Sequence, residues 1–159
     1  AEALAGLPGE FRLIVHGSLD DPGARDYFNS LSLPADRLEF RGTFPFEQMN
    51  DALADIDILI VPSTWEENCP LIVKYALATR TLAVVSDQPG IVAEREGKPG
   101  LIFFRPGDPA ALRAALVEGM ERLKTGPGGP SVAETLLSPV ADIREQARSL
   151  SREYERMVK

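Results

Sequence analysis

The 159-residue sequence contains one cysteine and one histidine. A single cysteine excludes an internal disulfide bond and suits the cytosol, although many exported proteins also lack disulfides. One histidine and one cysteine cannot supply the usual ligands of a zinc site without help from carboxylates. We therefore expect a cytoplasmic protein that has no zinc site built from these two residue types alone.

The sequence also lacks long apolar runs and an excess of basic residues. No apolar segment approaches the roughly 18 residues that a membrane-spanning helix needs. The first residues show no charged-then-apolar signal pattern, and we expect no transmembrane segment. Lysine and arginine number 17 against 24 aspartates and glutamates, a formal charge of −7. Because this charge repels a polyanion, we expect no nucleic-acid partner.

Short apolar runs alternate with helical patterns along the chain. Five runs rich in Val, Ile, Leu or Phe predict strands at residues 11–17, 38–44, 57–63, 81–87 and 100–106. Helical spacing predicts helices at 24–33, where Pro34 ends the helix, at 46–56, at 70–79 with Pro70 in the first position, and at 108–124 with Asp108 as N-cap. This alternation predicts an α/β fold, a Rossmann-like parallel sheet with helices on both faces.

The length is sufficient for one domain and not clearly for two. We assign that domain to residues 1–124, whose opening letters AEALAGLP resemble the end of a helix. This opening leads us to expect a missing strand and most of a helix upstream. Residues 125–131 predict a flexible linker, and residues 132–159 predict a helical segment that packs on the same domain.

The loops that follow the predicted strands hold polar side chains. In open parallel sheets, ligands bind beyond the carboxyl ends of the strands. That rule gathers the residues after each of the first four strands: His16, Gly17 and Ser18; Thr43, Phe44 and Pro45; residues 63–69; and residues 86–90. We therefore expect a binding site at this edge of the sheet.

The letters WEENCP, residues 65–70, stand immediately before a predicted helix. The first amides of that helix, those of Cys69, Leu71 and Ile72, have no acceptor within the helix, and together with the helix dipole they favour an anion. The nearby carboxylates can accept hydrogen bonds from sugar hydroxyls. The pattern therefore favours a ligand that contains both phosphate and sugar.

Three segments resemble the donor-binding half of a known enzyme family. They are DIDILIVPSTWEENCPLIVKYALATRTLAVVSDQPGIVAE (55–94), GLIFFRPGDPAALRAAL (100–116) and LEFRGTF (38–44). Together they resemble the carboxyl-terminal domain of family 4 retaining glycosyltransferases of group 1, which have the GT-B fold. The resemblance covers roughly residues 10–120.

The resemblance assigns roles to individual positions. Two glutamates separated by seven residues bracket the start of this helix in the family: the first matches Glu67 and would contact the transferred sugar. The second, which would hold the ribose, is replaced here by Tyr75. The family's glycine pair matches Pro89 and Gly90, so one glycine is lost, and Glu94 matches the acidic residue that follows. The family's basic phosphate clamp has no counterpart.

The resemblance implies a hexosyltransferase of polysaccharide biosynthesis that takes a nucleotide diphosphate sugar and a hydroxyl acceptor. It implies no metal or other cofactor, and a missing amino-terminal acceptor domain as partner. Glu67 is the expected catalytic residue. The residues expected to bind the donor are His16, Gly17, Phe44, Asn68, Cys69, Pro70, Leu71, Ile72, Tyr75, Ser86, Asp87, Gly90 and Glu94.

Other readings of the same residues remain open. Tyr75 and the lost glycine also fit a degenerate, non-catalytic nucleotide-binding or interaction module. A pair formed by Cys69 and His16 would indicate a thiol hydrolase, but no third residue that would orient the histidine is evident. Asn68 can serve simply as a helix cap, and adjacent acidic residues such as Glu66 are commonly solvated loop charges.

Overall fold

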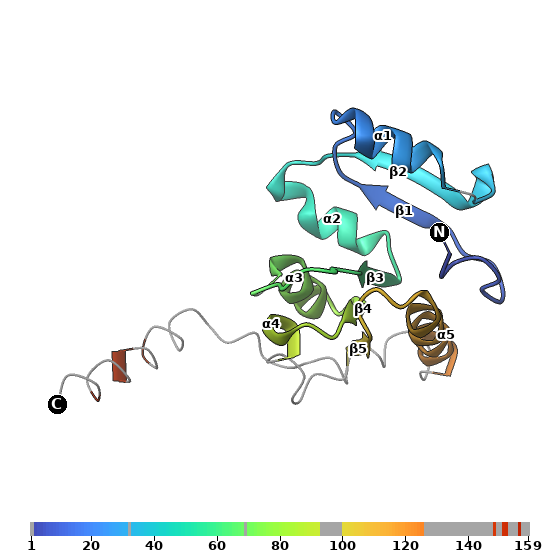
Figure 1. Cartoon of the computed structure of the whole chain (residues 1–159). Helices are drawn as coiled ribbons and strands as arrows, with labels where there is room; N and C mark the ends of the chain where they lie inside the picture. The colour runs from blue at the N-terminus through green and yellow to red at the C-terminus, as the bar shows by residue number, and fades with distance from the viewer. Residues whose placement is uncertain are drawn as a thin grey trace.

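The computed structural model describes residues 2–31, 33–68, 70–92 and 100–125, together with residues 148, 151, 152 and 156. Strands and helices alternate as the sequence predicts (Figure 1). The elements are β1 (Leu13–His16), α1 (Pro22–Asn29), η1 (Ala35–Arg37), β2 (Leu38–Gly42), η2 (Phe46–Gln48), α2 (Met49–Ala54), β3 (Ile58–Val61), α3 (Leu71–Thr79), β4 (Leu82–Ser86), α4 (Pro89–Val92), β5 (Leu101–Phe104) and α5 (Pro109–Thr125).

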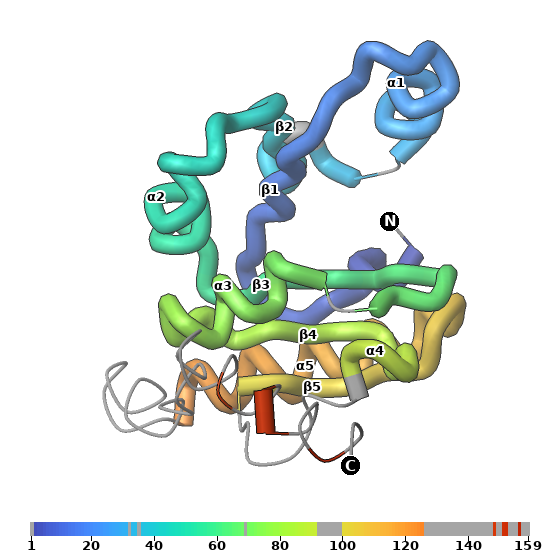
Figure 2. Tube along the Cα trace, turned by 90° about the vertical axis from the view of Figure 1, so that its left-hand side faces the viewer, coloured from blue at the N-terminus to red at the C-terminus, as the bar shows by residue number. Residues whose placement is uncertain are grey.

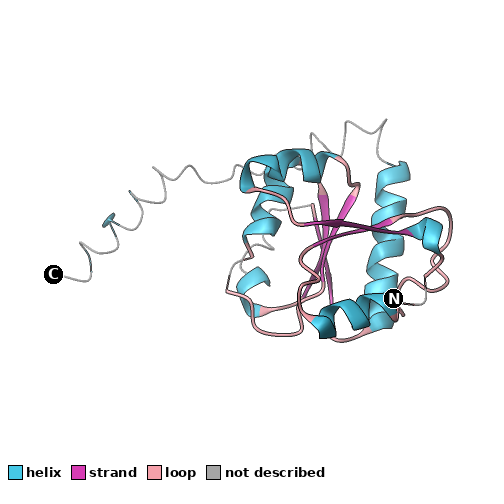
Figure 3. Ribbon diagram, turned by 90° about the horizontal axis from the view of Figure 1, so that it is seen from above, coloured by secondary structure: helices cyan, strands magenta, loops and turns pink. Residues whose placement is uncertain are grey.

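All pairs of hydrogen-bonded strands are parallel within the described residues, but they form two sheets where one was expected. One sheet pairs β1 with β2, and the other has the order β3-β4-β5. The strands of the two sheets cross each other in the view from above (Figure 3). Strands β1 and β2 have no buried residue, whereas all of β4 is buried. The three-stranded sheet is therefore the centre of the fold.

The central strand β4 packs against helices on both faces of its sheet. Leu82 and Val84 belong to the cluster that includes Ala115 and Leu116 of α5. The alternate residues Ala83 and Val85 pack instead with buried residues of α3. Successive side chains of a strand point to opposite faces, so the unbroken apolar run of β4 matches a strand covered on both sides (Figures 2 and 3). This arrangement confirms the predicted fold class.

Helix α5 begins at its predicted cap and lies close to the sheet. The Asp108 carboxylate accepts hydrogen bonds from the amides of Ala110 and Ala111, at 3.0 Å each. A Cβ added at Gly119 would lie 3.1 Å from the Ile58 side chain. The opening residues pack against this layer through Leu4, and they form turns rather than the expected helix end.

Two predicted helices have different bounds in the structure. The helix expected at 24–33 is α1, which begins earlier because the Asp21 carboxylate accepts a hydrogen bond from the Ala24 amide. It ends before Ser30, whose hydroxyl donates to the Tyr27 carbonyl. The helix expected at 46–56 divides into the 3₁₀ turn η2 and the shorter α2.

The carboxyl-terminal predictions lie mostly outside the described residues. Helix α5 includes Thr125, so the linker predicted at 125–131 cannot begin before residue 126. Within the segment predicted at 132–159, four residues are described and all are helical: Arg148, Ser151, Arg152 and Arg156. The packing of this segment on the domain stays a prediction.

Candidate functional site

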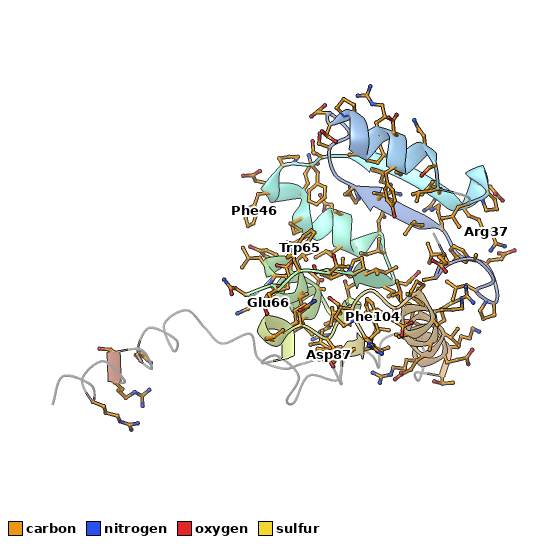
Figure 4. The ribbon with its side chains drawn as sticks, in the orientation of Figure 1. Arg37, Phe46, Trp65, Glu66, Asp87 and Phe104 are labelled. Carbon is orange, nitrogen blue, oxygen red and sulfur yellow. The ribbon has the colours of Figure 1, made fainter. Side chains whose placement is uncertain are left out.

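The loop between β3 and α3 carries most of the candidate residues. It follows the carboxyl end of β3, and the loop after the neighbouring strand β4 ends beside it. Figure 4 shows Phe46, Trp65 and Glu66 on the same side of the molecule. Phe46 and Trp65 are exposed, with 63% and 68% of their surfaces accessible. The expected binding edge is therefore open to solvent.

Glu67 is held by two hydrogen bonds from its own loop. The Ser63 hydroxyl donates to Glu67 Oε1 over 2.8 Å, and the Trp65 indole Nε1 donates to the same oxygen over 3.1 Å. Glu67 is half-buried, whereas its neighbour Glu66 is exposed. The loop therefore fixes the Glu67 carboxylate and leaves that of Glu66 in solvent.

Helix α3 begins one residue later than predicted, because Pro70 is its N-cap and Leu71 its first residue. No side chain caps the helix, so Asn68 does not serve as the cap. The Val73 amide donates to the Pro70 carbonyl over 3.0 Å. The amides of Leu71 and Ile72 belong to the first turn, where the helix offers no acceptor, and they can therefore receive an anion.

The loop after β4 supports the loop that carries Glu67. Gln88, which is 8% exposed, donates from Nε2 to the Ser63 carbonyl over 3.3 Å. The Ser86 hydroxyl, which is fully buried, donates to the Val61 carbonyl over 3.4 Å. A Cβ on Gly90 would lie 1.8 Å from the Glu67 carbonyl oxygen and 2.3 Å from that of Asn68. Only glycine allows this approach, so Gly90 and Ser86 act here as supports.

His16 and Phe44 meet at the carboxyl end of the two-stranded sheet. Their rings pack edge to face with centroids 4.8 Å apart. His16 Nδ1 lies 3.3 Å from the Gly42 carbonyl, which also accepts a hydrogen bond from the Gly17 amide over 3.0 Å. These contacts tie the two strand ends together.

A pocket of about 180 Å³ opens beside this aromatic pair. It is lined by His16, Arg41, Phe44, Gln48, Asp51, Ala52 and Asp55. The lining residues Arg41, Gln48, Asp51 and Asp55 were not predicted from the sequence. Their signal is the spacing of Gln48, Asp51 and Asp55, which lie three and four residues apart from the last residue of η2 to the residue after α2 and so share one helical face.

Arg41 links the pocket to an ion-pair network. Its guanidinium contacts Glu39 Oε1 over 2.7 Å and Asp55 Oδ2 over 2.6 Å, and Arg12 contacts the other Glu39 oxygen over 3.3 Å. Hydrogen bonding to Glu39 and Asp55 raises the pKa of Arg41. The bond from Arg41 lowers the pKa of Glu39 below 4.5. Arg41 is therefore already paired with two carboxylates.

Tyr75 connects the two groups of candidate residues. Its ring packs edge to face with that of Phe46 at a centroid distance of 5.7 Å, which joins η2 to helix α3. Tyr75, the position that the sequence resemblance matches to a ribose-binding glutamate, is therefore occupied by a ring in an aromatic contact.

Two predicted site residues, Cys69 and Glu94, lie outside the described residues, and the proposed Cys69–His16 pair lies outside them with Cys69. Asp87 is exposed at the end of β4, and its amide donates to the Phe104 carbonyl over 2.8 Å. The described residues contain no group of three or more His, Cys, Asp or Glu that could hold a metal ion.

Comparisons with known proteins place the chain in a family. The profile of the family described as "Glycosyl transferases group 1" matches residues 2–122. No curated protein matches significantly. Among solved structures, Anabaena Alr3699/HepE in complex with UDP and glucose matches with a TM-score of 0.73 and 19% sequence identity. This match covers 94% of the chain and 43% of the HepE chain, so the chain spans less than half of HepE.

The structural match and the parallel sheets agree on the fold. The chain has the Rossmann-like α/β fold that is found in one half of a GT-B glycosyltransferase. None of the helices in the described part of the chain is long and apolar enough to cross a membrane. Because the family profile covers most of the sequence, the chain belongs to the group 1 glycosyl transferases.

Proposed function

We propose that the chain binds a nucleotide diphosphate sugar as the donor-binding half of a family 4 retaining glycosyltransferase. The complete enzyme transfers a hexose to a hydroxyl acceptor. The observation that carries this proposal is the fixed Glu67 carboxylate, which accepts bonds from Ser63 and Trp65 beside the open first turn of α3. Family membership and the fold support the same assignment.

Three parts of the donor require three kinds of site. The pocket beside His16 and Phe44 offers two aromatic rings against which the base can pack. The amides of Leu71 and Ile72 offer donors to the diphosphate, where the helix dipole favours negative charge. These donors also stabilise the charge that develops on the leaving diphosphate. Glu67 then orients the sugar through its hydroxyl groups.

The acceptor half lies outside this chain in our proposal. The structural match covers 43% of the HepE chain, which agrees with a chain that forms one half of a larger enzyme. Transfer requires donor and acceptor to be held together in a near-attack geometry. We therefore expect the isolated 159-residue chain to bind the donor weakly without transferring its sugar. We assign the enzyme to polysaccharide synthesis in the cytoplasm, without a metal cofactor.

The binding test uses amide NMR on the 159-residue chain with UDP and UDP-glucose as probes, chosen because HepE was crystallised with UDP and glucose. We expect shifts to cluster at residues 16–18, 43–46, 66–72 and 86–91. GDP-mannose serves as a second base and sugar. Shifts scattered elsewhere, or none with any of these probes at millimolar concentration, would reject the proposed site.

The role of Glu67 is tested by Glu67→Ala, with Glu66→Ala as a matched control in the same loop. Loss of a charged hydrogen bond costs about 1.5–3 kcal/mol, which is roughly tenfold to a hundredfold in affinity. We expect that loss for UDP-glucose and almost none for UDP. Glu66→Ala should leave both affinities unchanged because Glu66 is exposed. Equal loss for UDP and UDP-glucose would assign Glu67 to the nucleotide instead.

A second candidate function is a non-catalytic nucleotide-binding or interaction module. The edge contact between Tyr75 and Phe46 favours it, since an aromatic ring stands where the family places a ribose-binding carboxylate. This alternative predicts that the complete protein binds the nucleotide or a partner and shows no transfer even with its other half present. Sugar transfer by the complete protein would exclude the alternative.

A further inference from the structure

The N–H of the Trp65 indole takes part in a hydrogen bond, while most of the ring is exposed to solvent. Its indole Nε1 donates to Glu67 Oε1 over 3.1 Å, while 68% of the residue is accessible to solvent. An isolated exposed hydrophobic residue on a protein surface needs no explanation. Here the hydrogen bond fixes the orientation of the ring, so the indole stands beside the Glu67 carboxylate in a defined position.

The Ser63 and Trp65 donors make the two oxygens of the Glu67 carboxylate unequal. Oε1 accepts hydrogen bonds from both Ser63 and Trp65. A carboxylate oxygen has two lone pairs, so these two bonds use the capacity of Oε1. Oε2 takes no part in either bond and keeps its lone pairs for a ligand. The loop therefore offers one carboxylate oxygen next to one exposed aromatic ring.

The loop that carries Trp65 and Glu67 packs against residues that follow β4. Gln88, almost fully buried, donates to the backbone carbonyl of Ser63. Gly90 lets the carbonyls of Glu67 and Asn68 pack directly on the first turn of α4. Side chains that are locked by packing and hydrogen bonds hold a binding geometry better than mobile ones. Trp65 and Glu67 thus lie in a loop that Gln88 and helix α4 support.

A hexose is complementary to this combination. One face of the pyranose ring carries mainly C–H groups, which pack on an aromatic ring, while the hydroxyls around the rim donate hydrogen bonds. Tryptophan presents a large apolar body with a polar tip, and the tip here is already bonded to Glu67. A sugar that rests on the indole can donate a rim hydroxyl to Glu67 Oε2.

We propose that Trp65 is a sugar platform that determines recognition of the donor hexose: the indole ring receives the C–H face of the sugar, and its N–H positions Glu67 so that Oε2 meets the hydroxyls. This inference rests on the proposed donor-binding function. The inference adds Trp65 to the residues that contact the sugar and gives Trp65 a second role in positioning Glu67. It also assigns recognition of the sugar and of the nucleotide to different residues.

The first test uses tryptophan fluorescence, because Trp65 is the single tryptophan of the chain. UDP-glucose should change the emission of the 159-residue chain, and UDP at equal occupancy should not. Amide NMR on the same samples establishes occupancy independently. If NMR shows that UDP-glucose occupies the site and the Trp65 emission changes no more than it does with UDP, the proposal that Trp65 contacts the sugar is wrong. The proposed donor-binding function would then still hold. If neither nucleotide binds, the donor-binding function itself fails, and this inference with it.

The second test separates the two roles of Trp65 with a pair of variants. Trp65→Ala removes the ring and the N–H, whereas Trp65→Phe keeps a smaller aromatic face and removes the donor to Glu67. An aromatic contact contributes about 0.5–1.5 kcal/mol, so Trp65→Ala should weaken UDP-glucose binding by at least about threefold to tenfold. Trp65→Phe should recover part of that loss, and UDP affinity should be unchanged in both.

The control is Tyr27→Ala, which removes another exposed aromatic residue, in α1 and outside the proposed site. We expect it to leave the ratio of UDP-glucose to UDP affinity unchanged. Both Trp65 variants should unfold at the wild-type urea concentration, since the residue is exposed. A wild-type affinity ratio in Trp65→Ala would overturn the proposal. Equal weakening of UDP and UDP-glucose would also overturn it, because a merely structural role of Trp65 affects both ligands.

Discussion

The Cα of Gly90 lies so close to the Glu67 backbone that a Cβ at Gly90 would come within 1.8 Å of the Glu67 carbonyl oxygen. The same Cβ would lie 2.5 Å from the Asn68 carbonyl carbon. These neighbours are backbone atoms, which cannot rotate away as the end of a side chain can. The position of the proposed sugar-binding carboxylate therefore depends on a glycine in the first turn of α4.

Gly90→Ala should displace the Glu67 loop and destabilise the protein. We expect a loss of about 1–3 kcal/mol in the free energy of unfolding, the usual range for overpacking, together with loss of UDP-glucose binding. Urea unfolding and NMR titration measure the two effects. The control is Gly119→Ala in α5, where the nearest atoms are side-chain ends and alanine favours the helix. Equal effects of the two variants would contradict our account of Gly90.

Arg80→Gly should stabilise the protein. Arg80 ends helix α3 with φ 64° and ψ 25°, in the left-handed region. That conformation costs an L-residue about 1–2 kcal/mol, and glycine avoids the cost but gains freedom in the unfolded chain. We expect a net gain of about 0.5–1 kcal/mol in urea unfolding. Arg80→Ala keeps the strained conformation and should show no such gain.

Tyr75→Glu tests the position where the family has a glutamate. We expect the phenol to replace part of the lost ribose contact, so the substitution should change UDP affinity by about tenfold or less in calorimetry. It should also cost about 0.5–1.5 kcal/mol of stability by removing the contact with Phe46. Phe46→Ala is the control for that contact. A much larger gain in affinity would mean that the ring blocks the ribose site.

Acid should remove the stabilisation contributed by Glu39. The hydrogen bond from Arg41 lowers the pKa of Glu39 below 4.5. A carboxyl group with a lowered pKa in the folded protein stabilises it above the unfolded value and loses that contribution as the pH falls through the folded value. The stability difference between wild type and Glu39→Gln should therefore be largest above about pH 4.5 and shrink below it.

Urea unfolding at several pH values measures this difference. The exposed Glu10→Gln variant corrects for the loss of one negative charge. Because the pairs between Arg41, Arg12 and Glu39 face solvent, the difference should also decrease in about 1 M salt. A difference between wild type and Glu39→Gln that grows toward acid would reverse the predicted sign.

Local chemistry made several elements predictable from the sequence. The cap Asp108 and the periodic apolar residues after it define α5 at the observed start. The apolar run of residues 81–87 predicted a strand, and β4 forms there with all of its residues buried. These features depend on neighbours along the chain, because helix caps and strand alternation are set within a few residues.

The family resemblance selected Glu67 and Gly90, but their relation is visible only in three dimensions. Glu67 lies in the loop after β3 and Gly90 in helix α4 after β4, and the parallel pairing of β3 with β4 brings them together. Residue spacing in the sequence does not predict that a Cβ at Gly90 would lie 1.8 Å from the Glu67 carbonyl oxygen. It does not predict either that Ser63 and Trp65 both donate to one oxygen of the Glu67 carboxylate. Packing at that edge therefore decided how the candidate residues support one another.

The sequence by itself determined the strand and helix order and the class of fold, because hydrophobic periodicity and caps act locally. The tertiary structure alone decided that the strands form two sheets, that Phe46 meets Tyr75, and that the face of α2 lines a pocket. Each of these depends on contacts between segments whose separation in the chain leaves many pairings open. The packing of the whole chain selects among those pairings.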